Sequence, residues 1–213
     1  MKVMRYIFLL GFILLINPNC VGQNQDLGLW TGIKVSKKIN KKFAFFTECQ
    51  VRFMQNGTNF ESLFIQGGID FELTKWYQLG GAYRYSNYGD FDANRFDIDN
   101  TFSHKIKDNS FAIRLKYQKS FVTHKLKGDR FRIRFKYSYK INKKVKPYFK
   151  AQYFFTKAYD YANWSQQRYS LGAVIRIAKK KFIDVFYNYE FEYNLAKPEK
   201  QYVLGVKYKL NYK

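Results

Sequence analysis

Cysteine, proline, histidine and long apolar runs are all scarce in this chain of 213 residues. It contains two cysteines, three prolines and two histidines. The prolines lie at Pro18, at Pro147 early in an alternating segment and at Pro198 in a polar stretch, which are positions that a β-sheet tolerates. No segment approaches the roughly 18 consecutive apolar residues of a helical membrane span. A helical membrane protein is therefore excluded.

Motifs for cofactors, metals and enzymes are missing as well. The sequence has no Gly-rich phosphate loop, no Cys/His metal spacing and no nucleophile-elbow pattern. We therefore expect no cofactor and no metal site, and we do not expect an enzyme.

Acidic residues are few, whereas aromatic residues are many. The chain has 38 Lys and Arg against 16 Asp and Glu, a formal net charge of +22, and 21% aromatic residues. A soluble protein would have to bury nearly all of its 22 Phe and 19 Tyr while keeping the basic side chains in water. Strands that alternate apolar and polar residues resolve this conflict, because one face meets lipid while the other lines a polar interior.

The first 22 residues have the three-part layout of a cleaved signal peptide. Two basic residues precede an apolar run from Tyr6 to Ile16, and small residues stand just before Gln23. The run is too short to span a bilayer as a helix. We expect export, with cleavage after Gly22.

Cleavage at that point leaves a single domain of residues 23–213 with one cysteine, Cys49, which cannot form an internal disulfide. A lipoprotein modified at Cys20 is the alternative route of export. The basic isoelectric point near 9.8 would otherwise suggest a nucleic-acid partner. Because the chain begins with an export signal, we expect membrane lipids as partners and no nucleic acid.

A period of two runs through almost all of the sequence from Leu27 onward. Between Arg130 and Ile141, for example, apolar residues at odd positions alternate with basic or polar residues at even positions. A helix would scatter these residues around its axis, whereas a strand separates them onto two faces. Eleven segments of this kind span about 27–36, 43–54, 60–73, 76–86, 95–106, 110–121, 130–141, 145–156, 166–178, 182–193 and 201–212.

The connections between these segments alternate in length. Short basic turns occupy residues 37–42, 142–144 and 178–181, and longer polar loops occupy residues 87–94, 122–129, 157–165 and 194–200. Outer-membrane barrels have short periplasmic turns and longer external loops. The sequence therefore predicts an antiparallel transmembrane β-barrel of about 10–12 strands in a bacterial outer membrane, with the Lys-rich turns in the periplasm. Eleven segments conflict with the even strand number usual for such barrels.

Aromatic residues recur at outward positions near the long-loop end of the segments, as an interfacial girdle requires. They are Phe53, Tyr85, Phe96, Phe121, Phe131, Phe155, Tyr169, Tyr193 and Tyr202. The alternative is a soluble sandwich or lipocalin-like barrel, which would place these rings in one small interior and turn the basic face outward.

Several short motifs resemble one family. They are Leu27–Thr31, Asn40–Phe43, Val51–Phe53, Tyr83–Tyr85, Arg132–Tyr137, Asn142–Lys144, Pro147–Tyr148 and Tyr202–Tyr208. With these motifs the chain resembles a family of uncharacterised outer-membrane β-barrels of Gram-negative bacteria, domain-of-unknown-function family 2490, over residues 25–212. The resemblance implies a fold and a location, and it implies no activity.

Inward charges form pairs when each turn is taken as the centre of its hairpin. Arg176 then faces Asp184, Arg168 faces Glu192, and Asp99 faces Lys116. These lumen ion pairs predict an interior held together by internal charges.

The segments between 110 and 156 break this rule, because their pairing places like charges opposite one another, which is unfavourable. Arg114 faces Lys136, Lys116 faces Arg134, and Lys136 faces Lys150. The candidate anion patch comprises Arg114, Lys116, Arg132, Arg134, Lys136 and Lys150. Acidic residues across the interior (Glu48, Asp70 and Glu72) could neutralise it, and otherwise an anion or water does.

Three classes of function follow. The first is a narrow pore or solute-binding barrel of unknown cargo, whose basic patch favours a small anionic solute. The second is a structural or assembly protein that acts through its loops or Lys-rich turns. The third is a lipid-modifying barrel enzyme. It is disfavoured because His104 faces outward with no serine in reach and Ser103 points inward.

Overall fold

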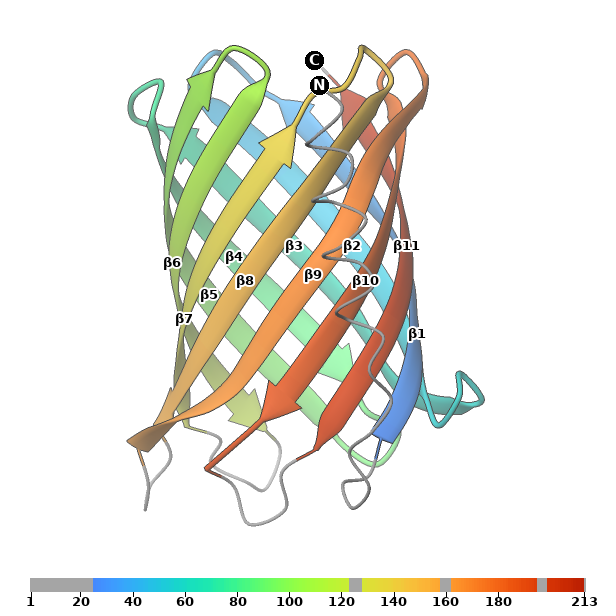
Figure 1. Ribbon diagram of the computed structural model, residues 1–213. Helices are drawn as coiled ribbons and strands as arrows, with labels where there is room; N and C mark the ends of the chain where they lie inside the picture. The colour runs from blue at the N-terminus through green and yellow to red at the C-terminus, as the bar shows by residue number, and fades with distance from the viewer. Residues whose placement is uncertain (1–24, 123–127, 158–161, 195–198, 213) are drawn as a thin grey trace.

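The computed structural model describes residues 25–122, 128–157, 162–194 and 199–212, all as one β-barrel (Figure 1). Its strands are β1 (Gln25–Lys38), β2 (Phe43–Met54), β3 (Asn59–Glu72), β4 (Tyr77–Asn87), β5 (Asp92–Ile106), β6 (Asn109–Val122), β7 (Asp129–Tyr139), β8 (Val145–Lys157), β9 (Ala162–Ala178), β10 (Lys181–Glu192) and β11 (Lys200–Tyr212). The predicted signal peptide lies outside the described residues. No helix in the described part of the chain is long and apolar enough to cross a membrane.

Each strand pairs with its neighbours in sequence, and the barrel closes between β1 and β11. The predicted all-β barrel of about 10–12 strands is confirmed, and the described residues form eleven strands, which departs from the even number usual for such barrels. With eleven alternating strands the first and last run in the same direction, so the closing pair is parallel, from Gln25 opposite Lys200 to Lys37 opposite Tyr212. This seam leaves no open sheet edge, which a membrane would not tolerate.

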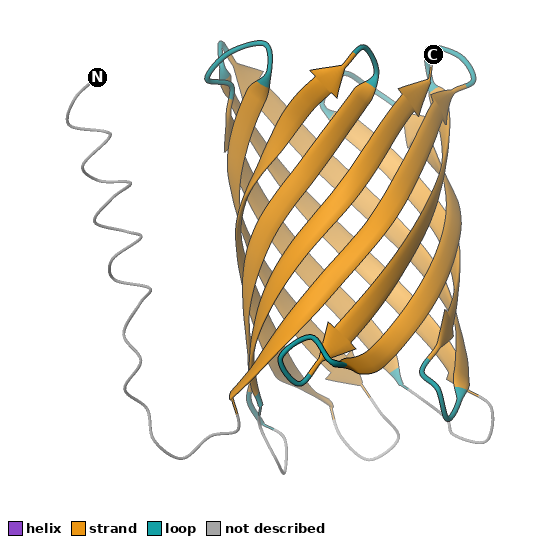
Figure 2. Cartoon of the chain, turned by 90° about the vertical axis from the view of Figure 1, so that its right-hand side faces the viewer, coloured by secondary structure: helices purple, strands orange, loops and turns teal. Residues whose placement is uncertain are grey.

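The two ends of the barrel differ (Figures 1 and 2). One end, which we call the turn end, carries the Lys-rich connections after β1, β7 and β9 and the end of β11. The other, the loop end, carries the start of β1 and the connections after β2, β4, β6, β8 and β10. The start of β1 and the end of β11 therefore lie at opposite ends.

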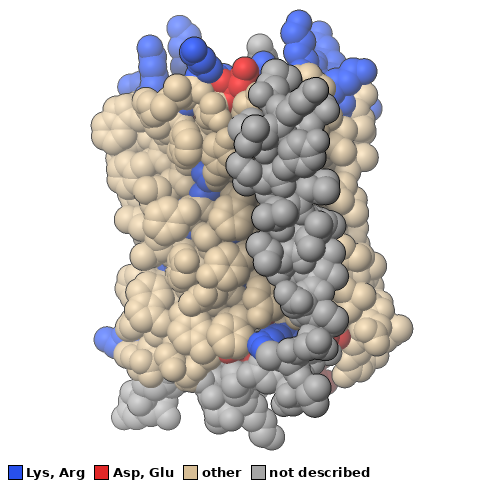
Figure 3. Space-filling view, viewed as in Figure 1, with Lys and Arg blue, Asp and Glu red and all other residues tan. Residues whose placement is uncertain are grey.

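The outer wall is apolar, and the interior is polar. Ile65, Ile98 and Leu204 are half exposed on the wall, whereas Asp97 and Glu190 are each only 2% exposed inside. Figure 3 shows a wall with few charges and Lys and Arg gathered at the turn end. This distribution is the reverse of a soluble barrel, so the sandwich or lipocalin-like alternative is excluded.

The outward aromatic residues touch one another around the wall near the loop end. Phe131 contacts Phe155, with ring centroids 6.5 Å apart, and Phe155 contacts Trp164 at 5.6 Å. Phe96 similarly contacts Phe121 at 6.1 Å. Phe96 is 54% exposed and Phe131 is 46% exposed. These rings have the placement of an interfacial girdle.

Candidate functional site: a basic lumen

The lumen holds a cavity of about 440 Å³ that is lined by residues from all eleven strands. Alternation explains this lining, because every second residue of each strand points inward. Fourteen of the lining residues are Lys or Arg, whereas four are Asp or Glu. Asp97, Glu61 and Glu190 pair with basic residues of the lining, and they reduce this excess without removing it.

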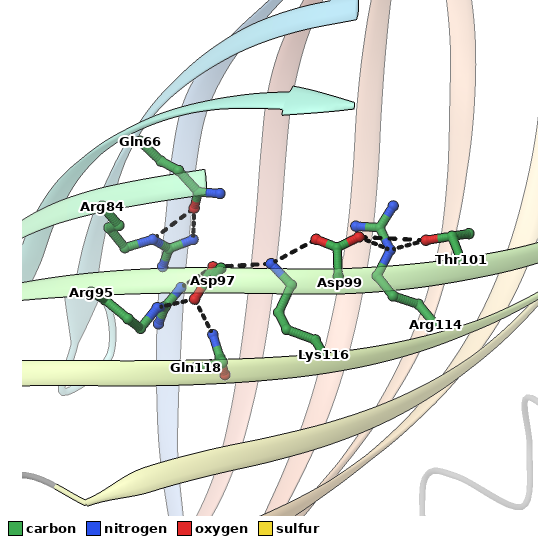
Figure 4. Close-up of polar contacts among 9 residues, drawn as sticks. All are labelled: Gln66, Arg84, Arg95, Asp97, Asp99, Thr101, Arg114, Lys116 and Gln118. Carbon is green, nitrogen blue, oxygen red and sulfur yellow. Dashed lines mark hydrogen bonds and ion pairs between the residues drawn. The ribbon is translucent and has the colours of Figure 1, made fainter. Parts of the chain in front are cut away.

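Asp97 on β5 is the centre of the densest charge network (Figure 4). Its carboxylate accepts hydrogen bonds from Arg95 Nε at 2.8 Å, from Lys116 Nζ at 3.0 Å and from Gln118 Nε2 at 3.0 Å. A buried carboxylate needs such donors, because an unpaired charge in the wall would be costly. Asp97 is thereby saturated.

Asp99, the next inward residue of β5, extends the same network toward the turn end. Lys116 Nζ lies 3.3 Å from its carboxylate, and Arg114 Nε lies 3.4 Å from it. Arg114 Nε also donates a hydrogen bond to Thr101 Oγ1 at 2.8 Å. Arg95, Arg114 and Lys116 therefore each have a carboxylate partner, with three cations sharing two carboxylates.

Two further ion pairs involve the inward lysines of β11. Lys207 on β11 pairs with Glu48 on β2 across β1, and Lys209 Nζ lies 2.5 Å from the Asp184 carboxylate. The Tyr148 hydroxyl donates a second hydrogen bond to Asp184 at 2.8 Å.

The register of β9 and β10 differs from the predicted one. Asp184 lies opposite Val174, not opposite Arg176, and Arg168 lies opposite Glu190, not opposite Glu192. A bulge between Lys181 and Phe182 shifts the pairing, which a symmetric turn does not anticipate.

Arg168 and Arg176, which we predicted to pair with Glu192 and Asp184, therefore have other neighbours. Arg168 Nε lies 2.7 Å from Glu190 Oε1. Arg176 is exposed, and its Nε donates to the carbonyl of Ala178 at 3.4 Å. Glu192 lies opposite Gln166. The predicted pairs Arg176–Asp184 and Arg168–Glu192 were thus wrong.

The structure brings all six residues of the candidate anion patch to the cavity. Asp99 lies opposite Lys116, and Lys136 lies opposite Lys150. Between β6 and β7 the pairing is two residues from the predicted one: Arg114 faces Arg134, and Lys116 faces Arg132. The like charges remain opposite one another, with different partners.

The patch divides into two parts. Arg114 and Lys116 are balanced by β5, whereas Arg132, Arg134, Lys136 and Lys150 pair with no carboxylate among the described residues. Two of the acidic residues that could have neutralised the patch from across the lumen pair with other lysines. Glu48 pairs with Lys207, and Glu72 pairs with Lys38.

Aromatic rings inside the lumen contact many of these cations. Lys150 Nζ lies 4.1 Å from the centroid of the Tyr148 ring, and Lys34 Nζ lies 4.1 Å from that of Phe46. The Arg84 guanidinium lies 3.6 Å from the centroid of Phe64. Such contacts stabilise cations that lack carboxylate partners.

Sequence reasoning missed these rings and several lumen cations. Trp30, Phe64 and Phe154 are nearly fully buried, and each contacts an arginine of an adjacent strand, namely Arg52 on β2, Arg84 on β4 and Arg168 on β9. Alternation carries the signal for Arg52, Arg84 and Arg130, since each has the inward parity of its strand. The pattern says nothing about which of them meet.

His104 lies on the outer wall near the turn end, in a shallow hollow with Trp76, Phe102, Phe111 and Ile113. Ser103 and Ala112 complete the lining of this largely apolar hollow. Within the described part of the chain no side-chain hydrogen bond joins Ser103 to His104, as a nucleophile and its base would require. Among the described residues no cluster of three His, Cys, Asp or Glu could hold a metal ion.

Solved outer-membrane barrels are similar in fold. The NanC porin matches with a TM-score of 0.53 and 12% identity, covering 76% of this chain and 84% of the porin. A bacterial polysaccharide outer membrane secretin matches with a TM-score of 0.50 and 11% identity, covering 78% of this chain and 63% of that protein. At these identities the likeness shows the fold alone.

Among curated proteins, none matches this sequence. Residues 27–201 match the family described as "Protein of unknown function (DUF2490)". That match covers well over half of the chain, as the motifs of the sequence implied. The chain belongs to the DUF2490 family of outer-membrane β-barrels.

Proposed function

We propose that this protein is an outer-membrane barrel that accepts anions in its lumen, either as a narrow pore or as a solute-binding barrel. The observation that carries the proposal is the excess of fourteen basic over four acidic side chains around the cavity. Rings of Arg and Lys are a means by which pores select anions.

Confinement strengthens this effect. Like charges in a narrow lumen are screened less than in bulk solution, so an unbalanced group of cations attracts small anions strongly. Arg132, Arg134, Lys136 and Lys150 supply such a group, since no described carboxylate pairs with them. These four cations therefore remain able to attract anions in the folded barrel.

The narrow interior argues against a wide general porin. The cavity has a volume of only about 440 Å³ and is lined by side chains from every strand. Buried rings such as Phe64, Tyr148 and Phe154 occupy part of the lumen. Only small or slender solutes fit a space of this size.

The apolar wall and its aromatic girdle support a location in the outer membrane. The predicted signal peptide would deliver the chain to the periplasm. The Lys-rich turn end would then face the periplasm, as short turns do in barrels of this kind.

Reversal potential across a salt gradient in planar bilayers tests the proposal. An anion-preferring pore shifts the potential toward the equilibrium value of chloride. If no current passes, equilibrium dialysis of the purified barrel against inorganic phosphate tests the solute-binding form. A cation-preferring current, or neither current nor bound anion, contradicts the proposal.

A second candidate is a structural or assembly role at the turn end, where Lys and Arg gather (Figure 3). Lys143 and Lys144 on one turn and Lys179 on another are exposed there, and Lys180 beside it is half-buried. Such a surface suits an anionic partner. Replacing these lysines by glutamine would impair an assembly role, and it would leave anion entry into the lumen unchanged.

A further inference from the structure

Four consecutive inward positions of β7 are basic. Arg130, Arg132, Arg134 and Lys136 all line the cavity. Inward positions on one strand are two residues apart, so these side chains leave the backbone at intervals of about 7 Å. The row begins at the loop end, one residue after the start of β7 at Asp129.

The neighbouring acidic groups are already occupied. Asp97 and Asp99 on β5 bind the charges of β5 and β6. On the other side of β7, Lys136 lies opposite Lys150, another cation. No carboxylate among the described residues pairs with any of the four β7 cations, whereas Arg95, Arg114 and Lys116 on the adjacent wall each have a carboxylate partner.

The Phe154 ring on β8 lies near two guanidiniums of β7. Arg130 and Arg132 each lie 5.7 Å from the centroid of Phe154. Arg132 Nε is buried and donates to no acceptor among the described residues. The N–H edge of an arginine is the part that binds carboxylate and phosphate oxygens in pairs.

At the end of the row nearest the turn end, the Tyr148 ring lies close to two lysines. Its centroid is 5.0 Å from Lys136 Nζ and 4.1 Å from Lys150 Nζ. The ring keeps these ammonium groups together despite their like charge. The row therefore ends in a further pair of cations that face the same cavity.

We propose that β7, together with Lys150, is a binding track for slender linear anions that carry three or more phosphate or carboxylate groups. The inference rests on the proposed function, namely that the lumen takes anions, and it adds the class of solute. A row of equally spaced cations engages several groups of one ligand at once, and linked contacts raise affinity beyond that of single ions. Such a ligand also relieves the repulsion between adjacent cations.

Equilibrium dialysis of the purified barrel in a nonionic detergent tests the track. The probes are inorganic phosphate, linear tripolyphosphate and tri-L-glutamate. We expect tripolyphosphate and triglutamate to bind at least about tenfold more tightly than phosphate. Binding of only one of these two probes would support the track and identify the chemical source of its ligand.

The variant Arg132→Gln/Arg134→Gln should weaken binding of the trivalent probes by about tenfold or more and that of phosphate by about threefold or less. The matched control, Lys143→Gln/Lys144→Gln, removes the same charge from a turn outside the cavity and should change neither. If the double variant does not fold, Arg132→Lys keeps the charge but removes the paired donors, and it should still weaken the trivalent probes.

Two outcomes separate the track from the proposed function. If phosphate and the trivalent probes bind equally, or if the β7 and turn variants behave alike, the track is overturned while anion uptake stands. If no anion binds and no anion-preferring current passes, the proposed function fails, and the track fails with it.

Discussion

The Phe186 ring lies directly against Gly205 on the adjacent strand, so that a Cβ at Gly205 would come within 2.1 Å of the ring. The same relation joins Phe46 to Gly68 at 2.6 Å. In both cases the two residues face each other across paired strands. Large rings thus fit in the narrow lumen because glycines opposite them leave room.

Gly205→Ala should therefore destabilise the barrel by about 1–3 kcal/mol, since the added methyl group forces Phe186 out of place. Urea unfolding of the refolded protein in detergent measures the change. Gly81→Ala is the matched control, because a Cβ there meets nothing within 4 Å. Equal unfolding midpoints for the two variants would contradict the packing described for this ring.

Asp97→Asn should cost about 3–5 kcal/mol of stability, because it leaves Arg95 and Lys116 without their shared carboxylate in the buried wall. The same unfolding assay applies. Asp90→Asn, in the exposed connection after β4, should leave the midpoint unchanged. A small effect of Asp97→Asn would mean that water replaces the carboxylate.

Phe135→Arg should impair membrane insertion, because it places a charge on the lipid-facing wall at a cost of about 2–4 kcal/mol. Phe135 is 46% exposed there. Lys136→Arg, at the adjacent inward position, should be nearly silent. The two variants are compared by the yield of folded barrel, which is measured on gels because unboiled folded protein migrates differently from boiled protein. Equal yields would show that the faces are assigned wrongly.

Orientation is tested by labelling single cysteines on intact cells, in a Cys49→Ser background. Asp90→Cys at the loop end should react with a membrane-impermeant thiol reagent, and Lys143→Cys at the turn end should react only after permeabilisation. This follows from short periplasmic turns and longer external loops. The opposite pattern would place the Lys-rich turns outside.

Strand positions could be predicted from the sequence because alternation persists along each strand. The segment predicted at 43–54 coincides with β2, Phe43–Met54. The prediction missed the start of β9, which begins at Ala162 and not at residue 166. A register shift between Phe154 and Phe155 accommodates this extension, and a bulge leaves no periodic signal.

Pairing could not be predicted to the same extent. The register of a hairpin depends on the shape of its turn, and a shift of two residues keeps every side chain on its face. Arg114 therefore still points into the lumen although it faces Arg134 and not Lys136. The parallel pairing of β1 with β11 likewise could not be predicted, because no turn connects these two strands. The sequence thus predicts which charges enter the lumen, whereas their partners depend on the register.

The reversal potential of Arg134→Glu/Lys136→Glu, compared with wild type across a salt gradient in planar bilayers, tests the central claim most directly. Both residues lie in the cavity and have no described carboxylate partner, so reversing their charge should abolish or invert the anion preference while the barrel still inserts. Lys143→Glu/Lys144→Glu, outside the cavity, should retain the wild-type potential. An anion preference that is the same in all three proteins would contradict a basic lumen as its source.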